Sequence, residues 1–111
     1  MVAPDLRGKT TKLEGCATCL VQNENYAFGI GVVLSGDWIL QSPLFSGEAG
    51  AFAYLPSQKV AISVAVTMAQ DAFQPDGDYK PEVGGNAADV LWREIGTALV
   101  PDDAPPTRKT D

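Results

Sequence analysis

The segment Val60–Met68 constrains the fold of this chain more than any other stretch of the sequence. Its even-numbered positions hold valine, isoleucine and methionine, and the positions between them hold alanine, serine and threonine. An alternation with a period of two residues predicts a β-strand. Because a large face fills a core and a small face lets a helix pack closely, the pattern favours a central strand that is covered on both faces.

A hairpin joins this strand to the arm before it, in which Phe52 and Tyr54 share one side. The connection contains Pro56, whose fixed backbone angle suits the second position of a tight turn. Similar alternation recurs earlier in the chain, where Gly29 and Gly31 fall on one face and favour the close approach of another backbone or a ligand. We therefore expect an antiparallel meander of about four strands: Tyr26–Leu34, Asp37–Ser42, Gly47–Leu55 and Val60–Met68.

The last regular element is predicted to be a helix, Asn86–Leu99. Asn86 is a good N-cap residue, and the charge of Asp89 meets the positive end of the helix. Pro101 cannot continue the helix and ends it. The apolar residues recur at helical spacing and predict the stripe that packs on the sheet, with Trp92 flanking it: Ala88, Leu91, Ile95, Ala98 and Leu99.

These elements predict one α+β domain, an antiparallel sheet with the C-terminal helix packed on one face. The chain has 111 residues, which suits a single domain. We expect residues 1–25 to be a flexible N-terminal segment, within which Thr18–Gln22 is a candidate short strand. Residues 26–100 form the sheet-plus-helix domain, and residues 101–111 form a disordered tail.

Charge and hydropathy exclude several classes of partner. The net charge is −6, so the chain repels the phosphate backbone and is not expected to bind nucleic acid. No apolar run approaches the roughly 20 residues that a membrane span needs, and no apolar segment of a signal peptide follows Met1. The chain as given is expected to be soluble.

Cysteine and histidine content argues against a metal or redox site. The chain has no histidine, and its two cysteines, Cys16 and Cys19, form an isolated C-x-x-C motif. Structural zinc generally needs four ligands, and a redox pair needs a helix N-terminus that lowers the thiol pKa. We expect either a local disulfide or two free thiols, and neither a metal site nor a cofactor.

The order of three motifs resembles a known family. Tyr26-Ala27-Phe28-Gly29-Ile30-Gly31 is similar to a Y-G-x-G-x strand, and Phe45–Phe52 is similar to a Lys/His-Ser/Thr-Gly motif that leads into a glycine-rich strand. Ala53-Tyr54-Leu55-Pro56, followed by Val60–Val66, is similar to the next hairpin. From Tyr26 to Leu99 the chain resembles the C-terminal part of the serine β-lactamase and penicillin-binding protein family, nearest its class C and esterase-like branch.

The resemblance implies that Phe45, Ser46 and Gly47 line the substrate cleft, as the edge strand whose backbone pairs with substrate. The third motif is degenerate, because Phe45 stands where the family has a lysine or histidine. The Ser-x-x-Lys nucleophile motif and the Tyr-x-Asn or Ser-x-Asn motif are absent from the sequence, and in the family both belong to a helical lobe. No catalytic residue is therefore assigned, and catalysis by these residues alone is not expected.

Two interpretations remain open. The first is a C-terminal part of a bacterial serine hydrolase of the β-lactamase, D-Ala-D-Ala carboxypeptidase or esterase type, which supplies one wall of the cleft. Its partner would be the helical lobe of the parent protein, and the parent would be exported to the cell envelope. The second is a non-catalytic binding or interaction module with the same fold, which could self-associate through a sheet edge.

Overall fold

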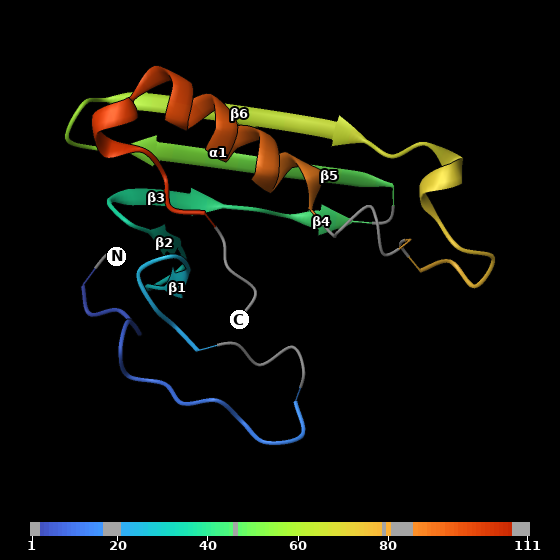
Figure 1. Cartoon of the computed structure of the whole chain (residues 1–111), viewed down its shortest axis with the longest axis horizontal. Coiled ribbons are helices and arrows are strands. Elements are labelled where there is room, and N and C mark those ends of the chain that lie inside the picture. Colours follow the sequence, from blue (N-terminus) through green and yellow to red (C-terminus); the bar gives the residue numbers. More distant parts are fainter. Residues whose placement is uncertain (1–2, 17–20, 46, 79, 81–85, 108–111) are drawn as a thin grey trace.

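The computed structural model describes residues 3–16, 21–45, 47–78, 80 and 86–107. It shows a curled antiparallel sheet with one helix packed on it, so the predicted α+β fold is confirmed (Figure 1). The helix is α1, Ala87–Leu99. The sheet has six strands: β1 (Ala27–Phe28), β2 (Val33–Ser35), β3 (Trp38–Gln41), β4 (Leu44–Phe45), β5 (Glu48–Leu55) and β6 (Val60–Thr67).

Strand β5 is the centre of the sheet. Strand β6 pairs with it along its whole length, from Glu48↔Thr67 to Leu55↔Val60. Strands β3 and β4 both lie along its other side, β3 opposite Phe52 and β4 opposite Ala49. Pro43 separates β3 from β4, because proline has no N–H to give to the ladder, but its carbonyl still accepts a hydrogen bond from the Gly50 N–H at 2.9 Å.

The prediction of one continuous strand from Tyr26 to Leu34 is wrong. The segment is a hairpin in which β1 and β2 pair with each other, with Phe28 opposite Val33. The Gly29 N–H donates to the Val32 carbonyl at 2.9 Å, and Gly31 has a φ of 73°. Glycine adopts positive φ without steric cost, so Gly31 allows the reversal that divides the predicted strand.

The prediction that Val60–Met68 is a central strand covered on both faces is also wrong. Among the described residues β6 pairs with β5 alone, so it is an edge strand. Its valines and Ile62 face α1, whereas Ala61, Ser63, Ala65 and Thr67 are exposed on the opposite face. The alternation of large and small side chains marks the strand correctly, but here the small face lies toward solvent.

The buried stripe of α1 differs from the predicted one. Leu91 and Ile95 are each 40% exposed and Leu99 is 63% exposed, although all three were expected to face the sheet. The helix is rotated so that a stripe containing two charged residues is buried. The charge pair is satisfied internally, as described below, so its burial is tolerated. The buried residues of α1 are Ala88, Asp89, Trp92, Arg93 and Gly96.

The core lies between α1 and the sheet and combines small with large side chains. The alanines of β5 lie opposite larger residues of β6, for example Ala51 opposite Val64 and Ala53 opposite Ile62. This arrangement leaves room for Trp38 and Trp92, both fully buried, whose ring centroids are 5.4 Å apart. Burial of such rings contributes most of the apolar area of a small core.

Residues 101–107 are ordered, contrary to the predicted disordered tail. Pro101–Asp103 form a short 3₁₀ helix after α1. The Trp38 indole N–H donates to the Asp103 carbonyl at 2.9 Å, and Pro105 packs on Gly96. The tail therefore closes one end of the core. Residues 108–111 lie outside the described residues.

The described parts of the N-terminal segment lie beside β1. The Leu6 N–H donates to the Phe28 carbonyl and the Gly8 N–H donates to the Gln22 carbonyl, both at 3.1 Å. The predicted strand Thr18–Gln22 falls mostly outside the described residues, and Gln22 is not in a strand. In the part of the chain that the structure describes, no helix has the length and apolar character needed to cross a bilayer.

Candidate functional site

The predicted substrate-binding segment lies at the tip of the β4–β5 hairpin. Phe45 ends β4 and pairs with Glu48, and Gly47 lies in the reversal with a φ of 86°. The Gly47 carbonyl accepts a hydrogen bond from the Met68 N–H at 2.8 Å, which attaches the tip to the end of β6. Ser46 lies outside the described residues. Phe45 belongs to a strand, whereas Gly47 forms a turn, so the segment is not one extended edge strand.

Phe45 belongs to an apolar surface on the side of the sheet opposite α1. Cross-strand pairing places Ile39 beside Tyr54, and Phe52 lies two residues before Tyr54 on the same face. Phe45 is 68% exposed and Phe52 is 50% exposed. We call Ile39, Phe45, Phe52 and Tyr54 the open sheet face.

Two shallow hollows adjoin Phe52 on this face. One lies between β3 and β6 and is lined by Ile39, Tyr54 and Ser63. The other lies near the β4–β5 tip and is lined by Pro43, Phe45 and Thr67. Their walls are mostly apolar, with Glu48 and small hydroxyl residues at the margin. The surface is therefore suited to contact an apolar group or a covering layer of protein.

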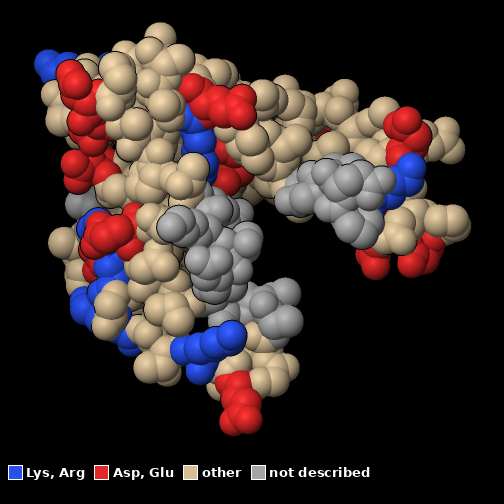
Figure 2. All heavy atoms as spheres, viewed as in Figure 1, with Lys and Arg blue, Asp and Glu red and all other residues tan. Residues whose placement is uncertain are grey.

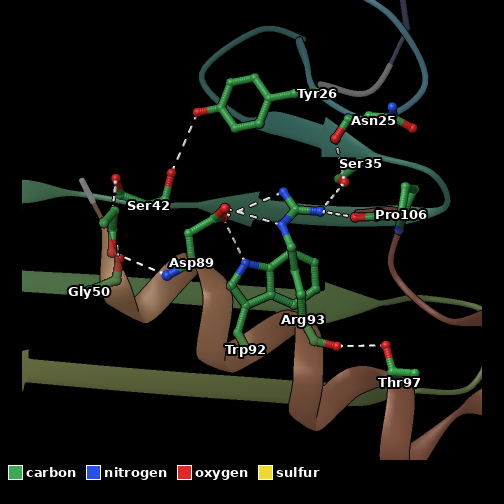
Figure 3. A network of polar contacts seen from close by, with 11 residues as sticks. Asn25, Tyr26, Ser35, Ser42, Gly50, Asp89, Trp92, Arg93, Thr97 and Pro106 are labelled. Atoms are coloured by element: carbon green, nitrogen blue, oxygen red, sulfur yellow. Dashed lines mark hydrogen bonds and ion pairs between the residues drawn. The ribbon is translucent and has the colours of Figure 1, made fainter. Parts of the chain in front are cut away.

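A buried polar network lies on the other side of the sheet, between α1 and β2 (Figure 3). The Asp89 carboxylate accepts from the Arg93 Nε at 3.1 Å and from the Trp92 indole N–H at 2.9 Å. The side chains of Asp89 and Arg93 are only 4% and 8% exposed. The guanidinium carbon also lies 4.7 Å from the centre of the Trp92 ring, a distance at which a cation and an aromatic face attract each other.

The same guanidinium connects α1 to two distant segments. Its Nη1 donates to the Ser35 hydroxyl at 2.7 Å and to the Pro106 carbonyl at 2.5 Å. Ser35 in turn donates to the Asn25 carbonyl at 2.6 Å. Because the carboxylate is balanced by a cation and already hydrogen-bonded, the network has the character of a structural connection and lacks that of a general base. Sequence reasoning placed Asp89 at the helix start, but the i, i+4 spacing of Asp89 and Arg93 was the signal for an ion pair.

The Asn86 side chain contacts the link between β3 and β4, which precedes the predicted substrate-binding segment at Phe45. Its side-chain oxygen accepts from the Asp89 N–H at 3.1 Å, which confirms the predicted N-cap. Its amide nitrogen lies within hydrogen-bond distance of the carbonyls of Ser42, Pro43 and Gly50, at 3.1, 3.2 and 3.1 Å. One side chain therefore attaches the start of α1 to the link between β3 and β4 and to β5. The capping role was readable from the sequence, but this attachment was not.

Basic side chains gather on the N-terminal segment, away from α1 (Figure 2). Arg7 forms ion pairs with Asp5 at 2.9 Å and with Glu24 at 3.0 Å. The hydrogen bond from Arg7 lowers the pKa of the Asp5 carboxyl below 3.8 and, reciprocally, raises the pKa of Arg7. These pairs are distant in the chain from Phe45 and stabilise the segment beside β1.

The described residues hold no group of three or more histidine, cysteine, aspartate or glutamate side chains with the geometry of a metal site. Cys16 is disulfide-bonded, and Cys19, the only other cysteine in the sequence, lies outside the described residues. The candidate site is the apolar surface formed by the open sheet face and the tip of the β4–β5 hairpin. No family model, curated protein or solved structure matches this chain.

Proposed function

We propose that this chain is the C-terminal sheet-and-helix part of a β-lactamase-like serine hydrolase, in which it supplies one wall of the active-site cleft. The nucleophile would come from a helical lobe encoded elsewhere in the parent protein. One observation carries the proposal: the open sheet face is apolar and lies beside the segment that resembles the family's third motif. The three resembling segments lie in chain order in β1 and the reversal after it, at the β4–β5 tip and in the β5–β6 hairpin, although the first is a hairpin here and one strand in the family.

The composition of the open sheet face supports a covering layer. An antiparallel sheet can leave one face in water, but that face then carries mainly polar side chains. Here Ile39, Phe52 and Tyr54 stand on neighbouring strands, and Phe45 adds a fourth large side chain. Contiguous apolar surface of this kind marks a site of protein or ligand contact.

Phe45 favours one class of substrate within the resembled family. A lysine or histidine at this position would help to hold a substrate carboxylate, but a phenyl ring cannot form such an ion pair. Its exposed ring suits an uncharged acyl or alkyl group instead, through apolar contact. Of the three parent activities, the structure therefore favours an esterase over a β-lactamase or a carboxypeptidase.

The experiment examines the native gene product and the isolated chain side by side. Antibodies raised against the isolated chain should detect a native product with a mass above 11.7 kDa. The sequence of that product should contain a Ser-x-x-Lys motif upstream of this chain. A fluorophosphonate probe phosphonylates reactive serines, because the serine oxygen attacks phosphorus and fluoride leaves; it should label that product but not the isolated chain. The isolated chain should hydrolyse neither a chromogenic β-lactam nor a short-chain nitrophenyl ester above background.

Two results would overturn the proposal. A native product of 11.7 kDa would exclude a parent hydrolase and favour the second candidate, a non-catalytic module that binds through the open sheet face. Turnover that copurifies with the isolated chain and disappears in Ser46→Ala would show that the nucleophile lies in the chain itself.

A further inference from the structure

The outer edge of β6 presents a full row of backbone hydrogen-bonding groups. In an antiparallel ladder, alternate residues of a strand direct their N–H and C=O groups to opposite sides. The Met68 N–H donates across the sheet to the Gly47 carbonyl, so the even-numbered residues of β6 face β5. Gly50 lies opposite Ala65, but its N–H donates to the Pro43 carbonyl, on the side of β5 away from β6. The Gly50–Ala65 pair therefore exchanges no hydrogen bond, which agrees with outward-facing backbone groups at the odd-numbered residues of β6. The residues whose backbone groups face outward are therefore Ala61, Ser63, Ala65 and Thr67.

This edge lacks the features that normally prevent strands from pairing. Proteins protect exposed edges with charged side chains, proline, bulges or short strand length. Strand β6 contains no charged residue and no proline, and its register with β5 is unbroken over all its residues. Within the described residues no other strand pairs with it, and it is the outermost strand of the sheet (Figure 1).

The helix adds an apolar flank on the same side of the molecule. Asp89 and Arg93 point toward β2, where Arg93 meets Ser35. Successive helical residues are about 100° apart, so Leu91 and Ile95 lie on the opposite flank, toward β6. We call Leu91, Ile95 and Leu99 the outer flank of α1; each is 40% exposed or more.

We infer that this edge and flank bind a second copy of this chain, with the two β6 strands antiparallel about a two-fold axis. The inference does not depend on the proposed function. Helix α1 lies over β5 and β6 (Figure 1). Neighbouring strands lie about 4.8 Å apart, and the two-fold axis would lie midway between the two β6 strands. A helix above the boundary between β5 and β6 is then about 4.8 Å from the axis, so the two symmetry-related helices would lie about 10 Å apart. Helices pack at 8–10 Å, so one operation joins the strands and brings the outer flanks together.

Register and charge fit the same arrangement. An axis at Val64 places Ser63 opposite Ala65 of the other copy, so every outward residue of β6 has a partner. This symmetric register keeps the valines on the helix side and the small side chains on the open side. Lys59 precedes β6 and Asp71 follows it, so antiparallel pairing brings opposite charges together at each end.

The first test is the mass of the chain as a function of concentration. Sedimentation should show a dimer, twice 11.7 kDa, that dissociates on dilution. The buffer needs about 0.15 M salt, which limits repulsion beyond about 8 Å, because each copy carries a net charge of −6. Amide exchange at Ala61, Ser63, Ala65 and Thr67 should slow as the concentration rises, while exchange at the even-numbered residues should not change.

Ser63→Pro removes an outward N–H but no bond to β5, and proline is tolerated at such an edge position. It should raise the dimer dissociation constant about tenfold or more, since one hydrogen bond is lost per copy. Should this chain not fold, Ser63→Lys keeps the backbone intact and introduces like charges near the axis. It should also weaken the dimer.

The helix flank has a matched pair of variants. Ile95→Glu places a charge on the outer flank and should raise the dissociation constant. Val90→Glu places the same charge at an exposed position that faces away from both β6 and the sheet, and should not. A wild-type chain that stays monomeric at its solubility limit overturns the inference. So does a dimer that is unaffected by both Ser63→Lys and Ile95→Glu.

Discussion

Replacing Arg93 by methionine should destabilise the chain more than any surface substitution. Methionine retains much of the apolar stem but loses the bonds to Asp89, Ser35 and Pro106 and the contact with the Trp92 ring. Asp89 then remains as an unbalanced charge whose side chain is 4% exposed. Removing one partner of a buried ion pair costs about 3–5 kcal/mol.

That loss is a large share of the total stability. A domain of this size is stable by about 5–15 kcal/mol, so Arg93→Met, at about 3–5 kcal/mol, should remove roughly a fifth or more of the free energy of unfolding. Urea unfolding with a slope of about 1–3 kcal/mol per M should show a midpoint at least about 1 M lower. Tryptophan fluorescence is a suitable signal, because Trp38 and Trp92 are both buried beside the network.

Two controls separate the lost charge balance from the lost side-chain volume. Arg7→Met makes the same substitution in a more exposed ion pair, in which the Arg7 side chain is 28% exposed. The expected loss of stability there is about 0–1 kcal/mol. The double variant Asp89→Asn/Arg93→Met removes the buried charge and should recover about 1–3 kcal/mol of the loss. The reasoning is refuted if Arg93→Met costs no more than Arg7→Met. It is equally refuted if the two substitutions at the buried pair have additive effects.

The remaining predictions concern the helix ends and the N-terminal segment. Asn86→Ala should cost about 2 kcal/mol in urea unfolding, more than an ordinary cap, because the attachment to the β3–β4 bend is lost as well; a cost under about 0.5 kcal/mol would contradict it. Gly96→Ala places a Cβ 2.9 Å from the Pro105 ring, so the strain should exceed the gain in helix propensity and speed limited proteolysis after residue 100; unchanged proteolysis would count against this. Arg7 lowers the pKa of Asp5 below 3.8, so their pair stabilises the fold above that pH and the contribution disappears as pH falls through the lowered pKa. Asp5→Asn should therefore be less stable than the wild type near pH 6, and the difference should shrink as the pH falls below 3.8; a difference that does not change with pH would refute the assignment.

The candidate site was partly readable from the sequence. Alternation along β5 placed Phe52 and Tyr54 on one side of a strand, and the motif order singled out Phe45 beside them. The turn at Gly47 and the pairing of Ile39 with Tyr54 were not readable, because both depend on the register between strands. Register is set by contacts across the sheet, and a shift by one residue exchanges the two faces.

The sequence by itself determined the elements whose signal is local. The β5–β6 hairpin follows from alternation and from Pro56, and α1 follows from helical spacing and the Asn86 cap. Each signal lies within a few neighbouring residues, and backbone geometry fixes it before any tertiary contact forms.

Only the tertiary structure decided how these elements are used. The sequence favoured the stripe of Leu91 and Ile95 for burial, yet the helix buries Arg93, because Ser35 and Pro106 satisfy the guanidinium. Arg93 and Ser35 are 58 positions apart, and Trp38 and the tail carbonyl that it binds are 65 apart. The choice of a buried face depends on the free energy of such distant contacts, and a periodic pattern along one element contains no information about them.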